Sequence, residues 1–176
     1  MLKQLEELAQ QGEWAEIYDD AANVEGFYTS KVIQATEDYT LLASISPKGM
    51  YDGYSLIITD NIFQINTGSQ YIRDLKKIYT ARDQKHLDWK HHQNDLLRSI
   101  LAFAQAHKLV IAVVAFGENL VEGFFKDIEE DVLVVSALTS QGEPDGETRL
   151  YIDDIVSISC DYEGAQALKI LHSSDE

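Results

Sequence analysis

Residues 28–65 have the sequence YTSKVIQATEDYTLLASISPKGMYDGYSLIITDNIFQI, and residues 121–158 have the sequence VEGFFKDIEEDVLVVSALTSQGEPDGETRLYIDDIVSI. At an offset of 93 residues the two stretches align without a gap. The identical positions are charged residues, glycines and isoleucines: Glu37-Asp38 with Glu130-Asp131, Gly49 with Gly142, Asp52-Gly53 with Asp145-Gly146, Asp60 with Asp153, Ile62 with Ile155, and Ile65 with Ile158. Charges and glycines at fixed turns are what two copies of one supersecondary unit share.

The chain length fits two small domains. Its 176 residues divide into predicted domains at 1–80 and 81–176, each near the lower size limit for an independent core. We therefore expect the halves to pack together or to dimerise. The 45% hydrophobic composition is sufficient for a folded core.

Each copy is predicted to contain a helix, about five short strands and a short helix. A short unit of this kind pairs its strand edges and encloses an apolar interior most economically as a small barrel. The predicted fold class is thus mainly β with helices (α+β), as two tandem five-stranded small barrels, each preceded by a helix.

Local patterns predict particular elements. Leucines at helical spacing predict an opening helix that ends near Gly12. A longer helix is predicted from about Trp89 to His107, and a buried strand over Leu109–Phe116. The Asp-Gly pairs in Tyr51–Tyr54 and in residues 141–146 predict the tips of tight hairpins.

The net charge of −16 restricts the expected partners. A surface this acidic repels phosphate backbones and acidic membranes, favours solubility and attracts basic partners. The single cysteine, Cys160, forms no intrachain disulfide, and burial is expected for it. The N-terminus lacks a signal-peptide pattern, and no apolar run reaches the ~20 residues of a membrane span. A cytoplasmic protein without membrane contact is predicted.

Residues 110–125, VIAVVAFGENLVEGFF, resemble the first motif of the Sm-like (Lsm) family. Apolar residues alternate into Gly117, and Gly123 follows at the family's spacing, whereas the first copy has Ser30 in that place. The resemblance covers residues 90–160 and, through the repeat, residues 1–67 more weakly. The resemblance implies a helix followed by a five-stranded, strongly bent small barrel. The two copies are then expected to be tandem Sm-like or SH3-like barrels.

The resemblance implies little about activity. Sm-like proteins typically form rings and bind RNA with an aspartate–asparagine pair in the first motif and an arginine–glycine or equivalent in the second. This chain has Leu133 or a neighbour where the asparagine is expected. At the second motif it has Ile152-Asp153-Asp154-Ile155, and the first copy has Thr59-Asp60-Asn61-Ile62. No RNA-binding residue carries over.

Residues 73–90 concentrate the basic charge of the chain. They have a net charge of +3, against −19 for the remainder. This segment is open to three interpretations: a solvated linker, a seam that meets the acidic face of another subunit, or a phosphate-facing patch. Tyr51 and Tyr54 could anchor a partner or stack a base, or pack across the hairpin. The candidate binding residues are Arg73, Lys76, Lys77, Arg82, Lys85, Lys90, Tyr51 and Tyr54.

No residue set predicts catalysis. His91 and Asp95, at i and i+4, form a weak metal pair without a second pair elsewhere. Asp52 and Asp145 each precede a glycine, where turn geometry explains an aspartate. Phosphate loops, dinucleotide fingerprints and nucleophile motifs are absent from the sequence. We expect no enzyme activity, no cofactor and no metal.

The sequence thus favours a non-catalytic interaction or regulatory module that binds a protein partner or self-associates. The alternative is an RNA-binding protein that uses the basic 73–90 segment, although the net charge disfavours RNA.

Overall fold

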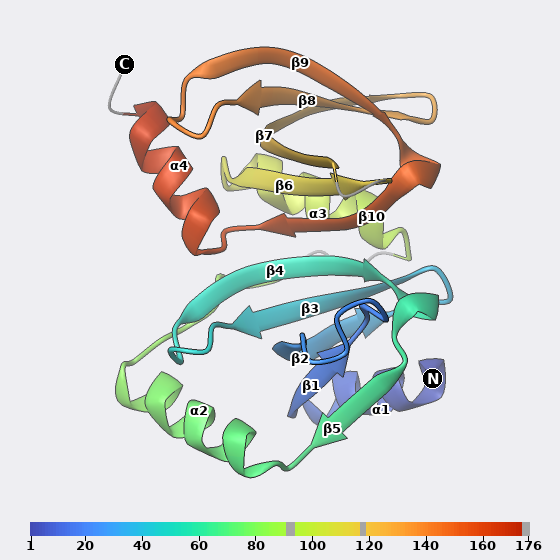
Figure 1. Cartoon of the computed structure of the whole chain (residues 1–176), viewed down its shortest axis with the longest axis vertical. Helices are drawn as coiled ribbons and strands as arrows, with labels where there is room; N and C mark the ends of the chain where they lie inside the picture. The colour runs from blue at the N-terminus through green and yellow to red at the C-terminus, as the bar shows by residue number, and fades with distance from the viewer. Residues whose placement is uncertain (91–93, 117–118, 174–176) are drawn as a thin grey trace. The chain divides into compact units, whose positions relative to one another are not determined.

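The structure is a computed structural model, and it describes residues 1–90, 94–116 and 119–173. The chain divides into two units, Met1–Leu96 and Leu97–Glu176. Figure 1 shows that both units have the same order of elements: a helix, four strands, a short 3-10 turn, a fifth strand and a closing helix.

The strands of the first unit pair in the antiparallel order β5-β1-β2-β3-β4. The elements of this unit are α1 (Leu2–Gln11), β1 (Trp14–Tyr18), β2 (Tyr28–Ala35), β3 (Tyr39–Ile45), β4 (Tyr51–Ile58), the 3-10 turn η1 (Thr59–Asn61), β5 (Gln64–Thr67) and α2 (Gln70–Ala81).

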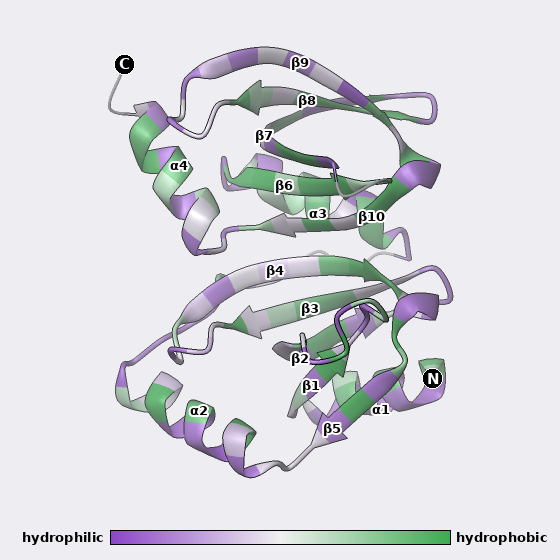
Figure 2. Cartoon of the chain, in the orientation of Figure 1, coloured by the Kyte–Doolittle hydropathy of each residue, from purple (hydrophilic) through white to green (hydrophobic). Residues whose placement is uncertain are grey.

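The second unit has the corresponding order β10-β6-β7-β8-β9, also antiparallel. In Figure 2, β6 and β8 are largely hydrophobic, whereas β9 is pale and purple. The elements are α3 (Leu96–Ala106), β6 (Val110–Ala115), β7 (Asn119–Glu129), β8 (Val132–Leu138), β9 (Pro144–Tyr151), the 3-10 turn η2 (Ile152–Asp154), β10 (Ile155–Cys160) and α4 (Glu163–Ser173).

The prediction of two closed five-stranded barrels is wrong. Within the described part of the chain, β5 is hydrogen-bonded only to β1, and β9 only to β8. Closure would require β5 to pair with β4, and β10 with β9. In the described residues, the ten strands form open antiparallel sheet, and four α-helices accompany them. The mixed α+β content was predicted correctly.

Helix α1 covers the apolar face of the first unit's sheet, which barrel closure was expected to bury. Leu5 and Leu8 of α1 pack in one cluster with Ile17, Val32 and Leu42 of the sheet. The helix α1 ends as predicted, because Gly12 takes the left-handed conformation (φ 63°) that terminates a helix. The first unit thus buries its sheet without pairing its end strands.

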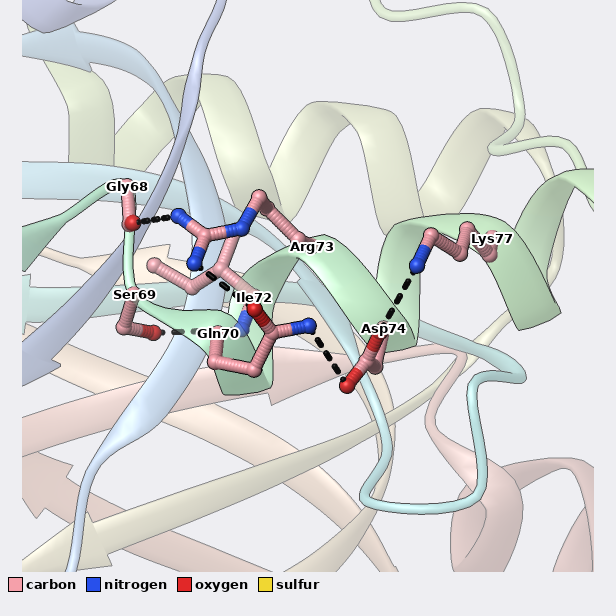
Figure 3. Close-up of polar contacts among 7 residues, drawn as sticks. All are labelled: Gly68, Ser69, Gln70, Ile72, Arg73, Asp74 and Lys77. Carbon is pink, nitrogen blue, oxygen red and sulfur yellow. Dashed lines mark hydrogen bonds and ion pairs between the residues drawn. The ribbon is translucent and has the colours of Figure 1, made fainter.

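A buried glutamate connects β1 with β5 and α2. Glu16 of β1 accepts hydrogen bonds from Asn66 Nδ2 at 2.9 Å and from Ser69 Oγ. Ser69 Oγ in turn accepts from the backbone N–H of Ile72 at 3.1 Å, which caps the N-terminus of α2 (Figure 3). Ile72 and Leu75 then pack against Trp14.

The two Asp-Gly pairs are not hairpin tips. The chain reverses before each pair, at Ser46–Met50 and at Thr139–Glu143. Gly53 (φ 69°) and Gly146 (φ 78°) lie inside β4 and β9, next to a shift in strand register. The glycines therefore serve bulges, where the left-handed conformation is also required.

The predicted helix from Trp89 to His107 starts too early, because Trp89 and Lys90 are not helical. The helix α3 begins only at Leu96, and residues 84–90 have no helical structure. Trp89 is instead 8% exposed and packs against Tyr54, with ring centroids 5.1 Å apart. The apolar stripe of α3 is buried as predicted, and so is Cys160.

Candidate functional site

The predicted basic residues lie on two consecutive parts of the first unit. Arg73, Lys76 and Lys77 belong to α2. The other three lie in residues 82–90, which we call the strap because this segment contacts β3, β4 and α2 of the unit. The three cations of the strap are Arg82, Lys85 and Lys90.

The cations of α2 are mostly engaged by their own helix. Figure 3 shows Arg73 donating to the carbonyl of Gly68 and to Oε1 of Gln70. Lys77 forms an ion pair with Asp74 at 2.9 Å. Of the three, only Lys76 forms neither a side-chain hydrogen bond nor an ion pair within residues 1–90, 94–116 and 119–173.

The strap cations also have local partners. Arg82 donates to the carbonyl of Lys48 at 3.1 Å. Lys85 pairs with Asp83 at 3.6 Å, and Lys90 with Asp88 at 3.5 Å, all on the surface. Exposed pairs of this kind contribute little to stability. They do lower the positive potential that a phosphate backbone would meet.

Side chains from the middle of the strap hold it against the rest of the first unit. His86 bridges two elements: Nε2 lies 2.8 Å from the carbonyl oxygen of Ser44, and Nδ1 lies 2.8 Å from the hydroxyl of Tyr79. Gln84 Oε1 accepts from the N–H of Tyr51 at 3.1 Å. Burial lowers the pKa of His86 to about 4, so the imidazole is neutral at pH 7. The strap is an integral part of the fold.

The two predicted tyrosines lie in β4 and not at a loop tip. Tyr54 is 2% exposed and donates its hydroxyl to the carbonyl of Leu87 at 2.5 Å. Tyr51 meets the His86 ring edge-to-face at 4.6 Å. The rings of His86 and Trp89 lie against the Tyr54 ring, with centroids 5.6 and 5.1 Å away, and occupy the space in which a nucleic-acid base would stack. These contacts are packing contacts, which correspond to one of the two predicted roles.

The strap borders a hollow of about 570 Å³, which we call the strap cavity. Its walls come from β1, β2, β4, α2 and the strap, and they include Trp14, Lys31, Tyr54, Tyr79 and Trp89. Sequence reasoning missed this hollow, because its residues are dispersed through the chain and share no local pattern.

The first unit contains a second hollow, and its lining includes acidic residues. We call it the acidic groove; its volume is about 400 Å³, and it is lined by Glu25, Phe27, Tyr28, Asp52 and Tyr71, among others. Phe27 and Tyr71 are 37% and 39% exposed and meet edge-to-face at 5.7 Å. Its lining contains no lysine or arginine among the described residues.

Two further carboxylates, Asp19 and Asp20, act on Tyr28 of the groove lining. Burial raises the pKa of Tyr28 to about 12, and the nearby charges of Asp19 and Asp20 act in the same direction. Burial also raises the pKa of Asp19 to about 6. The groove thus combines aromatic surface with negative charge.

The described part of the chain contains no group of three or more potential metal ligands. His91, of the predicted His91–Asp95 pair, lies outside the described residues. Within the same limits, no helix has the length and apolar character required to cross a membrane. Asp52 and Asp145 lie in separate strands and units.

Comparison with protein-family models finds no match, and comparison with curated proteins finds no significant one. The resemblance of residues 110–125 to the Sm-like motif therefore stays a prediction from the sequence.

Proposed function

We propose that this chain is a non-catalytic interaction module that binds a basic segment of a partner protein in the acidic groove. The observation that carries the proposal is the lining of the groove. Glu25 and Asp52 line the same groove as the partly exposed rings of Phe27 and Tyr71. Aromatic faces and carboxylates together favour arginine or lysine side chains, through cation–π attraction and charge-assisted hydrogen bonds.

The charge of the whole chain supports the same partner class. At −16, the protein attracts basic segments over long distances and repels nucleic-acid backbones. The lone cysteine fits a reducing compartment, and we place the module in the cytoplasm. Self-association was the other form of this prediction, but an acidic surface repels its own copies.

Calorimetric titration with defined peptides tests the proposal. The probe is a synthetic peptide of alternating arginine and leucine, and the comparison peptide has glutamate in place of arginine. We expect saturable binding of the basic peptide only. Asp52→Asn should weaken it by about tenfold, as expected for the loss of one charge-assisted contact.

The chain offers a matched control at the corresponding position of the second unit. Asp145 also precedes a glycine of positive φ in an edge-region strand, and Asp145→Asn removes the same charge. Equal weakening by both variants would mean that only net charge attracts the peptide, and it would overturn the groove as the site. Salt-sensitive binding of an oligouridylate, lost in Lys76→Glu/Lys77→Glu, would instead favour the RNA alternative.

A further inference from the structure

The strap cavity has features of a binding site that the acidic groove does not share. It lies within the first unit and, at about 570 Å³, is in the size range of small-molecule sites. Its exposed lining is more apolar than polar, and three of its walls are rings of Trp14, Tyr79 and Trp89. Nothing in the binding of a basic segment by the acidic groove uses this hollow.

The aromatic walls are fixed in position before any ligand arrives. Trp14 is 6% exposed and meets Tyr79 edge-to-face at 5.6 Å. Tyr79 is in turn fixed by its 2.8 Å hydrogen bond to His86. Rings restrained in this way lose little conformational entropy on binding.

The charges that line the cavity are mainly positive. Lys31 Nζ lies 5.2 Å from the centroid of the Trp14 ring, and within the described residues Lys31 makes no ion pair. Lys85 is the second cation of the lining, and the carboxylate of Asp88 is shared with Lys90. His86 adds no charge at neutral pH, because its pKa is about 4.

The position of Lys31 decides which ligand charge fits. The ammonium group already occupies the cation–π position over Trp14, so a cationic ligand would meet both repulsion and a covered ring face. An anion next to Lys31 would gain a charge-assisted contact in a partly desolvated place. The remaining ring surface suits a planar apolar body.

We propose that the strap cavity binds a small planar aromatic anion, with its ring against the aromatic walls and its anionic group at Lys31. Aromatic carboxylates and nucleoside monophosphates share this chemistry. The cavity would thus give the first unit a second ligand, of opposite charge to the segment taken by the acidic groove.

Three naphthalene probes that differ in charge test the proposal on the full chain. They are 2-naphthoate, 2-naphthalenemethanol and 2-naphthylmethylamine. Calorimetric titration measures the binding of each probe, because the naphthalene ring absorbs and emits where Trp14 and Trp89 do. We expect naphthoate to bind about tenfold more tightly than the alcohol and the amine to bind most weakly. Adenosine monophosphate, titrated in parallel, distinguishes a nucleotide from an aromatic acid.

Variants of Lys31 assign the charge selectivity. Lys31→Met should lower naphthoate affinity about tenfold and leave the alcohol nearly unchanged. Lys31→Arg should restore the preference, which covers the case in which Lys31→Met folds poorly. Lys169→Met, which removes a cation lining a hollow of the second unit, is the matched control and should change nothing. Equal binding of anion and amine, no effect of Lys31→Met, or no saturable binding of any probe would each overturn the proposal.

Discussion

The acidic groove and the strap cavity are two hollows of one unit with similar walls and opposite charge. Both are lined by aromatic rings, and their volumes, about 400 and 570 Å³, are of the same order. The groove adds Glu25 and Asp52, whereas the cavity adds Lys31 and Lys85. Under the two proposals, ring surface would give general affinity in both places, and one or two charged side chains would decide the class of ligand.

The largest effect is expected from removing the imidazole that fastens the strap. His86→Ala leaves the Ser44 carbonyl and the Tyr79 hydroxyl without their partner, and we expect a loss of about 2–4 kcal/mol of stability. Naphthoate binding should be lost and peptide binding in the acidic groove retained. Urea unfolding followed by tryptophan fluorescence measures the first effect.

Lys90→Ala, at an exposed strap residue that does not line the cavity, serves as the control and should change stability by less than about 0.5 kcal/mol. If His86→Ala weakened both ligands alike, the two hollows would be one coupled site and the comparison would fail.

Two partly buried groups of the first unit, His86 and Asp19, should also respond to acid in opposite directions. The pKa of His86 is lowered from 6.5 to about 4, so its contribution to stability is complete above pH 6.5 and is lost as the pH falls towards 4. The pKa of Asp19 is raised from 3.8 to about 6, so its ionised form destabilises the fold above pH 6 and the cost disappears as the pH falls towards 4. Each effect amounts to at most about 3 kcal/mol.

Single substitutions separate these opposing terms. Relative to the native chain, His86→Gln should gain stability between pH 6.5 and 4, and Asp19→Asn should lose it. Urea midpoints at pH 7.0, 5.5 and 4.5 give the comparison, and the double variant should return to the native pH profile within about 1 kcal/mol. Shifts of the same sign in both single variants would refute this assignment of the two groups.

The smallest expected effect is a change in charge preference. Lys31→Glu places a carboxylate where the cavity now has an ammonium group, and it should make the strap cavity resemble the groove. We expect the amine probe to bind about tenfold more tightly than naphthoate in this variant, the reverse of the native order. Titration with both probes measures it, and an unchanged order would show that charge does not govern the selectivity of the cavity.

Sequence reasoning predicted the elements whose signals are local. The spacing of Leu5 and Leu8 with Gly12 predicted α1, and the apolar run before Phe116 predicted β6. It failed where distant contacts decide. Trp89 continues a helical pattern, but its ring packs against Tyr54, outside α3. The Asp-Gly pairs signal turns, but the chain has already reversed before them, at Ser46–Met50 and at Thr139–Glu143.

The candidate sites were predicted only in part. The local concentration of positive charge in residues 73–90 was visible, and so were the aspartates that pair with it. The contacts of Arg82 with Lys48 and of His86 with Ser44 were not, because they join positions far apart along the chain. The aromatic lining of the strap cavity joins Trp14 to Trp89, and no periodicity connects such positions. Barrel closure is likewise a property of strand pairing and cannot be read from strand count.

The buried carboxylate of Glu16 has a consequence for how the first unit opens. It accepts from Asn66 of β5 and from Ser69, the residue that caps α2. Separating either element would leave a carboxylate in the interior without its donors. β5 and the start of α2 should therefore exchange their amide hydrogens together, as one cooperative opening unit, rather than fray from the sheet edge one residue at a time.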